Sequence, residues 1–247
     1  MRRRASFGAA WVLLVVCAHA QSGDRIEVAD FSRLAPGASL PAQWREVTVS
    51  RIPRHTRYTL VSDAGVTVLR AQADASMSSL AREVRVDPAR TPFLLWRWKV
   101  QNLVEKSDPR KKQGDDFPAR LYVFFDYDIG KLPLAQRMKI RLARAFYGEV
   151  PLAALCYVWA TSEKLDTRLW NAYTDRVRVI VAQSGAARLG RWVEQERNVA
   201  DDYREAFGEA PPAITGIALA TDTDDTRSHA TAFYGDVAFL SAPADER

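Results

Sequence analysis

The sequence predicts an all-β protein, a jelly-roll-like antiparallel β-sandwich with two helical insertions. Short segments of alternating apolar and polar residues recur along the chain, separated by Pro, Gly and Asp. Aromatic and β-branched residues, which favour strands, are concentrated in these segments. Only two segments carry apolar residues at the three- and four-residue steps typical of helices. A chain of 247 residues, 47% of them hydrophobic, can bury one substantial core.

The first 20 residues have the features of a secretory signal peptide. Residues 2–4 are arginines, residues 8–17 form an apolar run, and residues 18–20 (Ala-His-Ala) make a small-residue cleavage site. The alternative, an uncleaved membrane anchor, needs a longer apolar run than this. We therefore predict export, cleavage after Ala20, a periplasmic location and a single domain over residues 21–247.

Removal of this peptide changes the charge of the protein. The loss of three arginines leaves 32 basic against 30 acidic residues, a net charge near +2 in place of +5. That balance gives no support for a nucleic-acid partner. Cys156 is then the only cysteine, so an internal disulfide is impossible, which is compatible with a bacterial periplasm. Because Cys156 lies among apolar residues, we expect a buried, unreactive thiol.

The first part of the mature chain contains six predicted strands. Gly65 permits the turn between two of them, and Asp87-Pro88 ends another. In the last of the six, Trp96 and Trp98 alternate with Arg97 and Lys99, which places the two pairs on opposite faces. The predicted strands are Arg25–Phe31, Trp44–Ser50, Thr56–Val61, Val66–Ala71, Ser76–Val86 and Phe93–Val100.

The segment 114–126 (GDDFPARLYVFFD) combines an acidic turn with a strand. Gly114 and the two aspartates after it predict the turn, and Pro118 closes it. Apolar residues at positions 121, 123 and 125 then alternate with polar and aromatic ones. Both faces carry bulky side chains, so we expect a central strand with one face in the core and the other lining a groove.

Two helices and five more strands complete the prediction. The helix Leu134–Tyr147 is basic and amphipathic, so it could make a peripheral membrane contact or lay its apolar stripe on the sandwich. The second helix, Asp201–Phe207, ends at Gly208. The remaining strands are Leu155–Thr161, Val177–Gln183, Trp192–Asn198, Ile214–Thr221 and Ala230–Leu240.

Seven segments, in order along most of the mature chain, resemble the bacterial family called domain of unknown function 3047. This resemblance implies an exported bacterial protein with no established activity. The layout is also similar to jelly-roll carbohydrate-binding modules, at the level of fold only. The seven segments are WRWKV (96–100), GDDFPARLYVFFD (114–126), YVWA (157–160), GRWVEQERNV (190–199), DYREAFG (202–208), PPAITGIALATDTDDT (211–226) and YGDVAF (234–239).

Polar residues of the strands 93–100 and 119–126 would share one exposed face if these two strands pair. Aromatic surface beside planar hydrogen-bond donors suits a sugar or an anion. The competing interpretation is an outer face of mutual salt bridges, and strand tryptophans lie mostly in cores. The predicted ligand-binding residues are Arg97, Lys99, Asp115, Asp116, Arg120, Tyr122, Asp126 and Trp159.

No catalytic residue, cofactor or metal site is predicted. The acidic turns 115–116 and 222–225 could bind calcium, but aspartates that bond their own turn explain the same residues. Glu194 and Glu196 lie about 7 Å apart on one strand, which approaches the spacing of glycosidase carboxylates. Catalytic pairs usually come from different strands, and the sequence shows neither a Ser-His-Asp order nor a His/Cys cluster.

The sequence thus favours an exported, non-catalytic protein that binds a carbohydrate or an anionic envelope glycan. A glycan-cleaving hydrolase or lyase is one alternative, and a structural cell-envelope protein is another. Nothing in the sequence predicts an oligomeric state.

Overall fold

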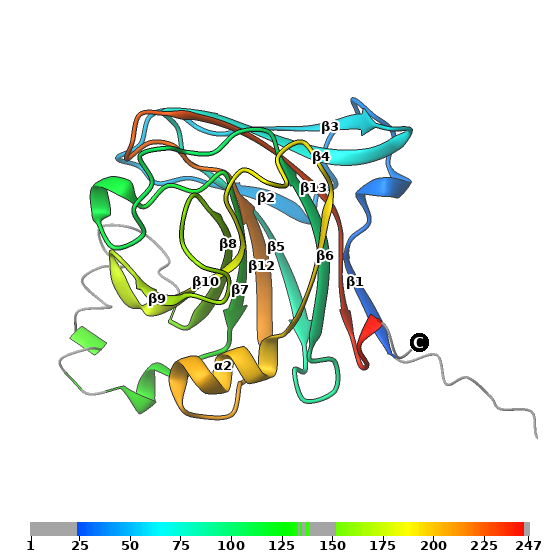
Figure 1. Cartoon of the computed structure of the whole chain (residues 1–247). Coiled ribbons are helices and arrows are strands. Elements are labelled where there is room, and N and C mark those ends of the chain that lie inside the picture. The colour runs from blue at the N-terminus through cyan, green and yellow to red at the C-terminus, as the bar shows by residue number, and fades with distance from the viewer. Residues whose placement is uncertain (1–23, 133, 135–136, 139–151, 245–247) are drawn as a thin grey trace, which may run out of the picture.

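Two β-sheets packed face to face form a jelly-roll-like sandwich, as the sequence predicts (Figure 1). The computed structural model describes residues 24–132, 134, 137–138 and 152–244. The predicted signal peptide lies outside these ranges. Within them, no helix is long and apolar enough to cross a membrane.

One sheet has six strands, in the order β11-β6-β13-β4-β3, with β1 paired to β13. All of its pairs are antiparallel. Its strands are β1 (Arg25–Ala29), β3 (Arg57–Asp63), β4 (Val66–Asp74), β6 (Phe93–Val100), β11 (Val193–Asn198) and β13 (His229–Leu240).

The other sheet has seven strands, in the order β2-β5-β12-β7-β8-β10-β9. This sheet is mixed, because β8 and β10 are parallel while all its other pairs of adjacent strands are antiparallel. The edge strand β9 is not among the predicted strands. The seven are β2 (Trp44–Val47), β5 (Ser79–Val86), β7 (Ala119–Phe125), β8 (Ala154–Ala160), β9 (Arg168–Asn171), β10 (Thr174–Ser184) and β12 (Ile214–Ala220).

The helix α2 (Val199–Phe207) lies across one end of the sandwich (Figure 1). It begins two residues earlier than predicted, because the Asn198 side chain accepts hydrogen bonds from the first free backbone N–H groups. Gly208 ends it in the left-handed conformation, with φ at 74°. The predicted helix Leu134–Tyr147 lies mostly outside the described residues. Short 3₁₀ turns occur at η1 (Phe31–Arg33), η2 (Lys112–Gly114) and η3 (Ile129–Lys131).

The main core fills the space between the sheets. Trp96 packs on Tyr157 with ring centroids 5.2 Å apart, and Trp98 packs on Trp159 at 6.2 Å. All three tryptophans are buried. Alternate residues of β8 face the other way and form a second apolar cluster on the far side of the seven-stranded sheet, which includes the buried Cys156.

Candidate functional site

The predicted site residues do not share one face of one sheet. β6, which carries Arg97 and Lys99, lies between β11 and β13 in the six-stranded sheet. β7, which carries Arg120 and Tyr122, lies between β12 and β8 in the seven-stranded sheet. The condition for a shared face, that these two strands pair, is therefore not met, because each has two other neighbours. Six of the eight residues fall into two separate polar clusters.

The first cluster surrounds a buried arginine, and we call it the Arg120 cluster. Arg120 is 2% exposed. Its Nε and Nη2 donate to the two carboxylate oxygens of Asp222, at 2.8 and 2.5 Å. Its Nη1 donates to Asp115 Oδ1 at 3.4 Å and to the Tyr122 hydroxyl at 3.2 Å, and Nη2 also donates to the Asp115 carbonyl. The cluster consists of Asp115, Asp116, Arg120, Tyr122, Asp222 and Asp224.

Each N–H group of Arg120 therefore has a partner inside the protein. The bidentate geometry with Asp222 is the strong form of an arginine–carboxylate pair. Because no donor is left for a ligand, Arg120 holds the 112–118 segment and the 221–225 turn together. The interpretation as mutual salt bridges fits this arginine better than the groove interpretation does.

Three carboxylates of the Arg120 cluster crowd one another. Asp116, Asp222 and Asp224 each place an oxygen within 4.8 Å of the others. Burial raises the pKa of Asp222 well above its usual range, and burial with the charges of Asp116 and Asp225 raises the pKa of Asp224 to about 6. These oxygens could hold a divalent cation. Asp116, however, does not bond its own turn, since it accepts the backbone N–H of Thr226 at 2.6 Å.

The second cluster lies on the outer face of the six-stranded sheet, and we call it the Arg97 face. Trp96 and Trp98 point into the core, so alternation along β6 turns Arg97 and Lys99 outward. The face consists of Asp63, Arg97, Lys99, Trp192, Glu194 and Gly235.

Within this face, Lys99 and Trp192 are tied to one carboxylate. Asp63 accepts from Lys99 Nζ at 2.5 Å and from Trp192 Nε1 at 2.6 Å. The hydrogen bond from Lys99 lowers the pKa of Asp63 below its usual value. Lys99 is only 7% exposed, so it is a partnered lysine that fixes the tryptophan.

Arg97 is held differently, by stacking and close packing and without a hydrogen bond to the described part of the chain. Its guanidinium carbon lies 4.7 Å from the centre of the Trp192 ring. On its other side is Gly235, where a Cβ atom would come within 2.5 Å of the arginine Cγ and Nε. The Arg97 side chain makes no hydrogen bond or ion pair with any described residue. The sheet thus presents a fixed guanidinium with its donors unused.

A shallow pocket of about 120 Å³ adjoins Arg97. Glu194 lines it from the neighbouring strand, directly opposite Arg97 in the β11–β6 register, yet the two make no ion pair. Asp236 also lines it, and Ser32 occupies both of its carboxylate oxygens, at 2.9 Å from the backbone N–H and 2.5 Å from the hydroxyl. The pocket is lined by Arg25, Leu95, Trp96, Arg97, Glu194, Asp236 and Ala238.

The other two predicted site residues lie apart from both clusters. Trp159 is fully buried in the core and donates to the Gly185 carbonyl at 3.2 Å. Asp126 is exposed just past the end of β7, where it pairs with Arg85 at 3.5 Å. The burial predicted for Cys156 is confirmed, and burial raises the pKa of its thiol to about 12. Its low reactivity stays a prediction.

Sequence reasoning missed the residues that fix each arginine. Asp222 is 102 positions from Arg120, and no local pattern links them. Trp192 was recognised only as the start of a strand. A glycine inside a strand can mark a close approach of another group, and that signal could have found Gly235.

A family model described as "Protein of unknown function (DUF3047)" matches residues 42–238. Among curated proteins, no match is found. The solved structures similar to this chain include the carbohydrate-binding module CBM29_1 of Piromyces equi, with 8% identity, a TM-score of 0.37, and coverage of 92% of this chain and 95% of that one. They also include a cellulase derived from Cel12A of Rhodothermus marinus, with 11% identity, a TM-score of 0.36, and coverage of 87% and 100%. Scores this low carry no argument about function.

Proposed function

The chain belongs to the DUF3047 family, whose description assigns no function, and we propose that it is a non-catalytic binding protein for an anionic envelope glycan. The proposed binding surface is the Arg97 face. A single observation carries this proposal: Arg97 is fixed between Trp192 and Gly235 with no hydrogen-bond acceptor among the described residues. The proposal includes export to the periplasm after cleavage of residues 1–20.

The chemistry of a fixed guanidinium supports an acidic group as the ligand. Its planar fork of N–H donors matches the two oxygens of a carboxylate, or two oxygens of a phosphate or sulfate. A charge that is partly removed from water without a partner costs free energy, and a ligand anion would recover it. Stacking on Trp192 restricts the side chain beforehand, so less conformational entropy is lost on binding.

The surroundings of Arg97 support a sugar as the carrier of that acidic group. Glu194 is exposed and makes no ion pair with a described residue, so its oxygens can accept hydrogen bonds from hydroxyl groups. The adjoining pocket is smaller than the 300 Å³ or so that encloses a drug-sized ligand. The pocket is large enough for one substituent of a glycan chain that lies across the sheet.

The pocket also supports binding without cleavage. Hydrolysis of a glycosidic bond ordinarily uses two carboxyl groups on either side of it. Of the two carboxylates in this pocket, Asp236 is occupied by Ser32, which leaves Glu194.

The test is a binding titration of residues 21–247 with acidic and neutral oligosaccharides of equal length. We expect binding of the acidic series, weakened by added salt. Arg97→Ala should reduce affinity by about 1–3 kcal/mol, the scale of a charged hydrogen bond. The control is Arg188→Ala, because Arg188 is an exposed arginine in the loop after β10.

Equal affinity of the wild type and Arg97→Ala for every acidic glycan would remove the Arg97 face as the site. Release of new reducing ends during the titration would instead establish the hydrolase alternative.

A further inference from the structure

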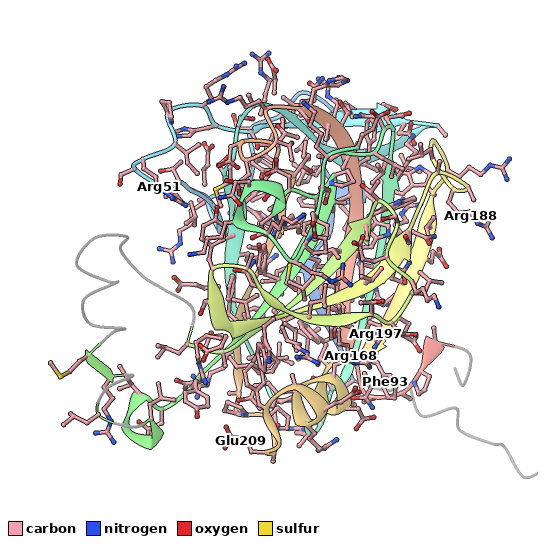
Figure 2. The ribbon with its side chains drawn as sticks, turned by 60° about the vertical axis from the view of Figure 1, so that its left-hand side comes forward. Arg51, Phe93, Arg168, Arg188, Arg197 and Glu209 are labelled. Atoms are coloured by element: carbon pink, nitrogen blue, oxygen red, sulfur yellow. The ribbon has the colours of Figure 1, made fainter. Side chains whose placement is uncertain are left out.

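Three arginines lie together where the edge of the seven-stranded sheet meets α2. Arg168 is on β9 and donates to two carboxylates of α2, Asp202 at 3.1 Å and Glu205 at 3.0 Å. Arg176 and Arg178 are on β10, and Arg178 is directly opposite Trp170 of β9 in the strand register. Figure 2 shows Arg168 and Arg197 beside α2, whereas Arg188 lies at a loop far from it.

Each of these three arginines has a buried N–H group without an acceptor. The atoms are Arg168 Nε, Arg176 Nη2 and Arg178 Nε. Across the residues that the structure describes, no other arginine has such a group. Buried polar groups are nearly always paired in proteins, so three cationic ones at one location call for a partner.

Arg178 is the least satisfied of the three. Its side chain makes no hydrogen bond and no ion pair within the described ranges, and its guanidinium carbon lies 4.8 Å from the centre of the Trp170 ring. Arg176 at least donates through Nε to the Leu152 carbonyl, at 2.6 Å.

The aromatic residues around these arginines hold them and keep the location partly open. Trp170 is 40% exposed and meets Phe207 of α2 edge-on at 5.7 Å. Arg176 lies over Phe207 at 5.6 Å and over Tyr127 at 4.4 Å. This arrangement repeats, on the other sheet, the stacked and unpaired arginine of the Arg97 face.

Two described carboxylates of α2 that lie beside these arginines are already engaged. Asp202 accepts from Arg197 at 2.6 Å as well as from Arg168, and the Tyr157 hydroxyl donates to it at 2.8 Å. Glu205 pairs with Arg168. Neither of these two carboxylates pairs with Arg178.

We propose that Arg178 and Trp170 form a second, independent site for a group with several anionic oxygens. A carboxylate, phosphate or sulfate has the oxygens that a guanidinium binds in pairs. Such a group could be a free inorganic anion or the acidic substituent of a sugar, and the experiment has an arm for each. The site does not depend on the Arg97 face.

The experiment measures melting temperature against sulfate or phosphate concentration at constant ionic strength, with chloride as the reference. Sulfate stabilises proteins in general without saturation, so the readout is the saturable part of the rise. We expect a saturable rise in melting temperature in the wild type, in Arg97→Ala and in the control Arg188→Gln. In Arg178→Gln this saturable rise should be at most half of the wild-type value. A second arm replaces the salts with a uronic-acid disaccharide and its neutral counterpart.

If the saturable rise in melting temperature is the same in Arg178→Gln as in the wild type, the proposal is wrong. It is also wrong if sulfate, phosphate and the uronic-acid disaccharide all fail to produce a saturable rise in the wild type. If Arg178→Gln does not fold, Arg178→Lys keeps the charge and loses the planar fork, so the apparent affinity should fall severalfold. In Arg97→Ala, anion binding should also change tryptophan fluorescence with the same midpoint, and adding Trp170→Phe to this variant should remove that change. A fluorescence change retained in the double variant would place the anion elsewhere.

Discussion

Arg120 and Arg97 lie on strands of opposite sheets and show two different uses of the same side chain. Arg120 is 2% exposed, and all its donors are taken by Asp222, Asp115 and Tyr122. Arg97 is stacked on Trp192, and its donors meet no acceptor in the described part of the chain. The first arginine joins two segments of the fold, while the donors of the second are unused by the described residues. An arginine on a strand therefore has no fixed role until its neighbours are known.

The largest expected effect is that of Arg120→Ala on stability. The change leaves Asp222 and Asp115 buried without their cation, which should lower the free energy of unfolding by about 3–5 kcal/mol. Urea denaturation measures it, and the exposed Arg188→Ala should stay within about 0.5 kcal/mol of the wild type. Glycan affinity of the folded fraction should not change. A stable Arg120→Ala protein with weakened binding would reverse the roles of the two arginines.

Gly235→Ala tests whether the fixed position of Arg97 matters for binding. The three atoms nearest to the new methyl group all belong to the flexible Arg97 side chain, and Gly235 is outside the left-handed region, so we expect the fold to tolerate the change. The guanidinium must leave its place while its charge stays. We expect acidic-glycan affinity to fall about tenfold, or about 1.4 kcal/mol, with little change in melting temperature. Affinity equal to the wild type would show that charge alone, without the fixed position, accounts for binding.

Asp224→Asn tests the crowding of carboxylates in the Arg120 cluster. The folded pKa of Asp224 is about 6, above the value near 4 of an unfolded aspartate. Ionisation of Asp224 therefore destabilises the fold as pH rises from about 4 to 6, and the full cost is present above that window. Because the side chain is partly exposed, we expect Asn to add only about 1 kcal/mol at pH 7.5 and nothing at pH 4.

Denaturation of both proteins at the two pH values, with a chelator present, measures this difference. A gain of the same size at pH 4 would mean that charge repulsion is not its cause.

The smallest expected effect is that of Glu194→Gln on the Arg97 face. Glu194 lies opposite Arg97 without pairing, so it weakly repels an anionic ligand. Removing its charge should raise acidic-glycan affinity by a few tenths of a kcal/mol, which low-salt titration can resolve. Glutamine keeps one acceptor oxygen for a sugar hydroxyl, so a loss of affinity would show that the charged carboxylate contributes more by hydrogen bonding than it costs by repulsion.

The sequence alone predicts a two-sheet sandwich, most of its strands and a buried Cys156. Alternation along a strand is a local property, so the faces of β6 and β7 could be assigned residue by residue. The acidic turns and the strand arginines were also recognisable as polar groups in unusual places.

Which strands are neighbours, and therefore which residues form the two clusters, depends on the assembly of the two sheets. Strand pairing joins residues far apart in sequence, so β6 and β7 could not be assigned to different sheets from their own residues. The four-residue β9 has no alternation strong enough to predict, yet it supplies Trp170. Arg120 is hydrogen-bonded to Asp222, which is 102 positions away in the sequence. Arg97 stacks on Trp192 and lies close to Gly235, which belong to two other strand regions. Whether the donors of an arginine are hydrogen-bonded within the protein depends on these non-local contacts, because residues distant in sequence come together only when the sheets assemble.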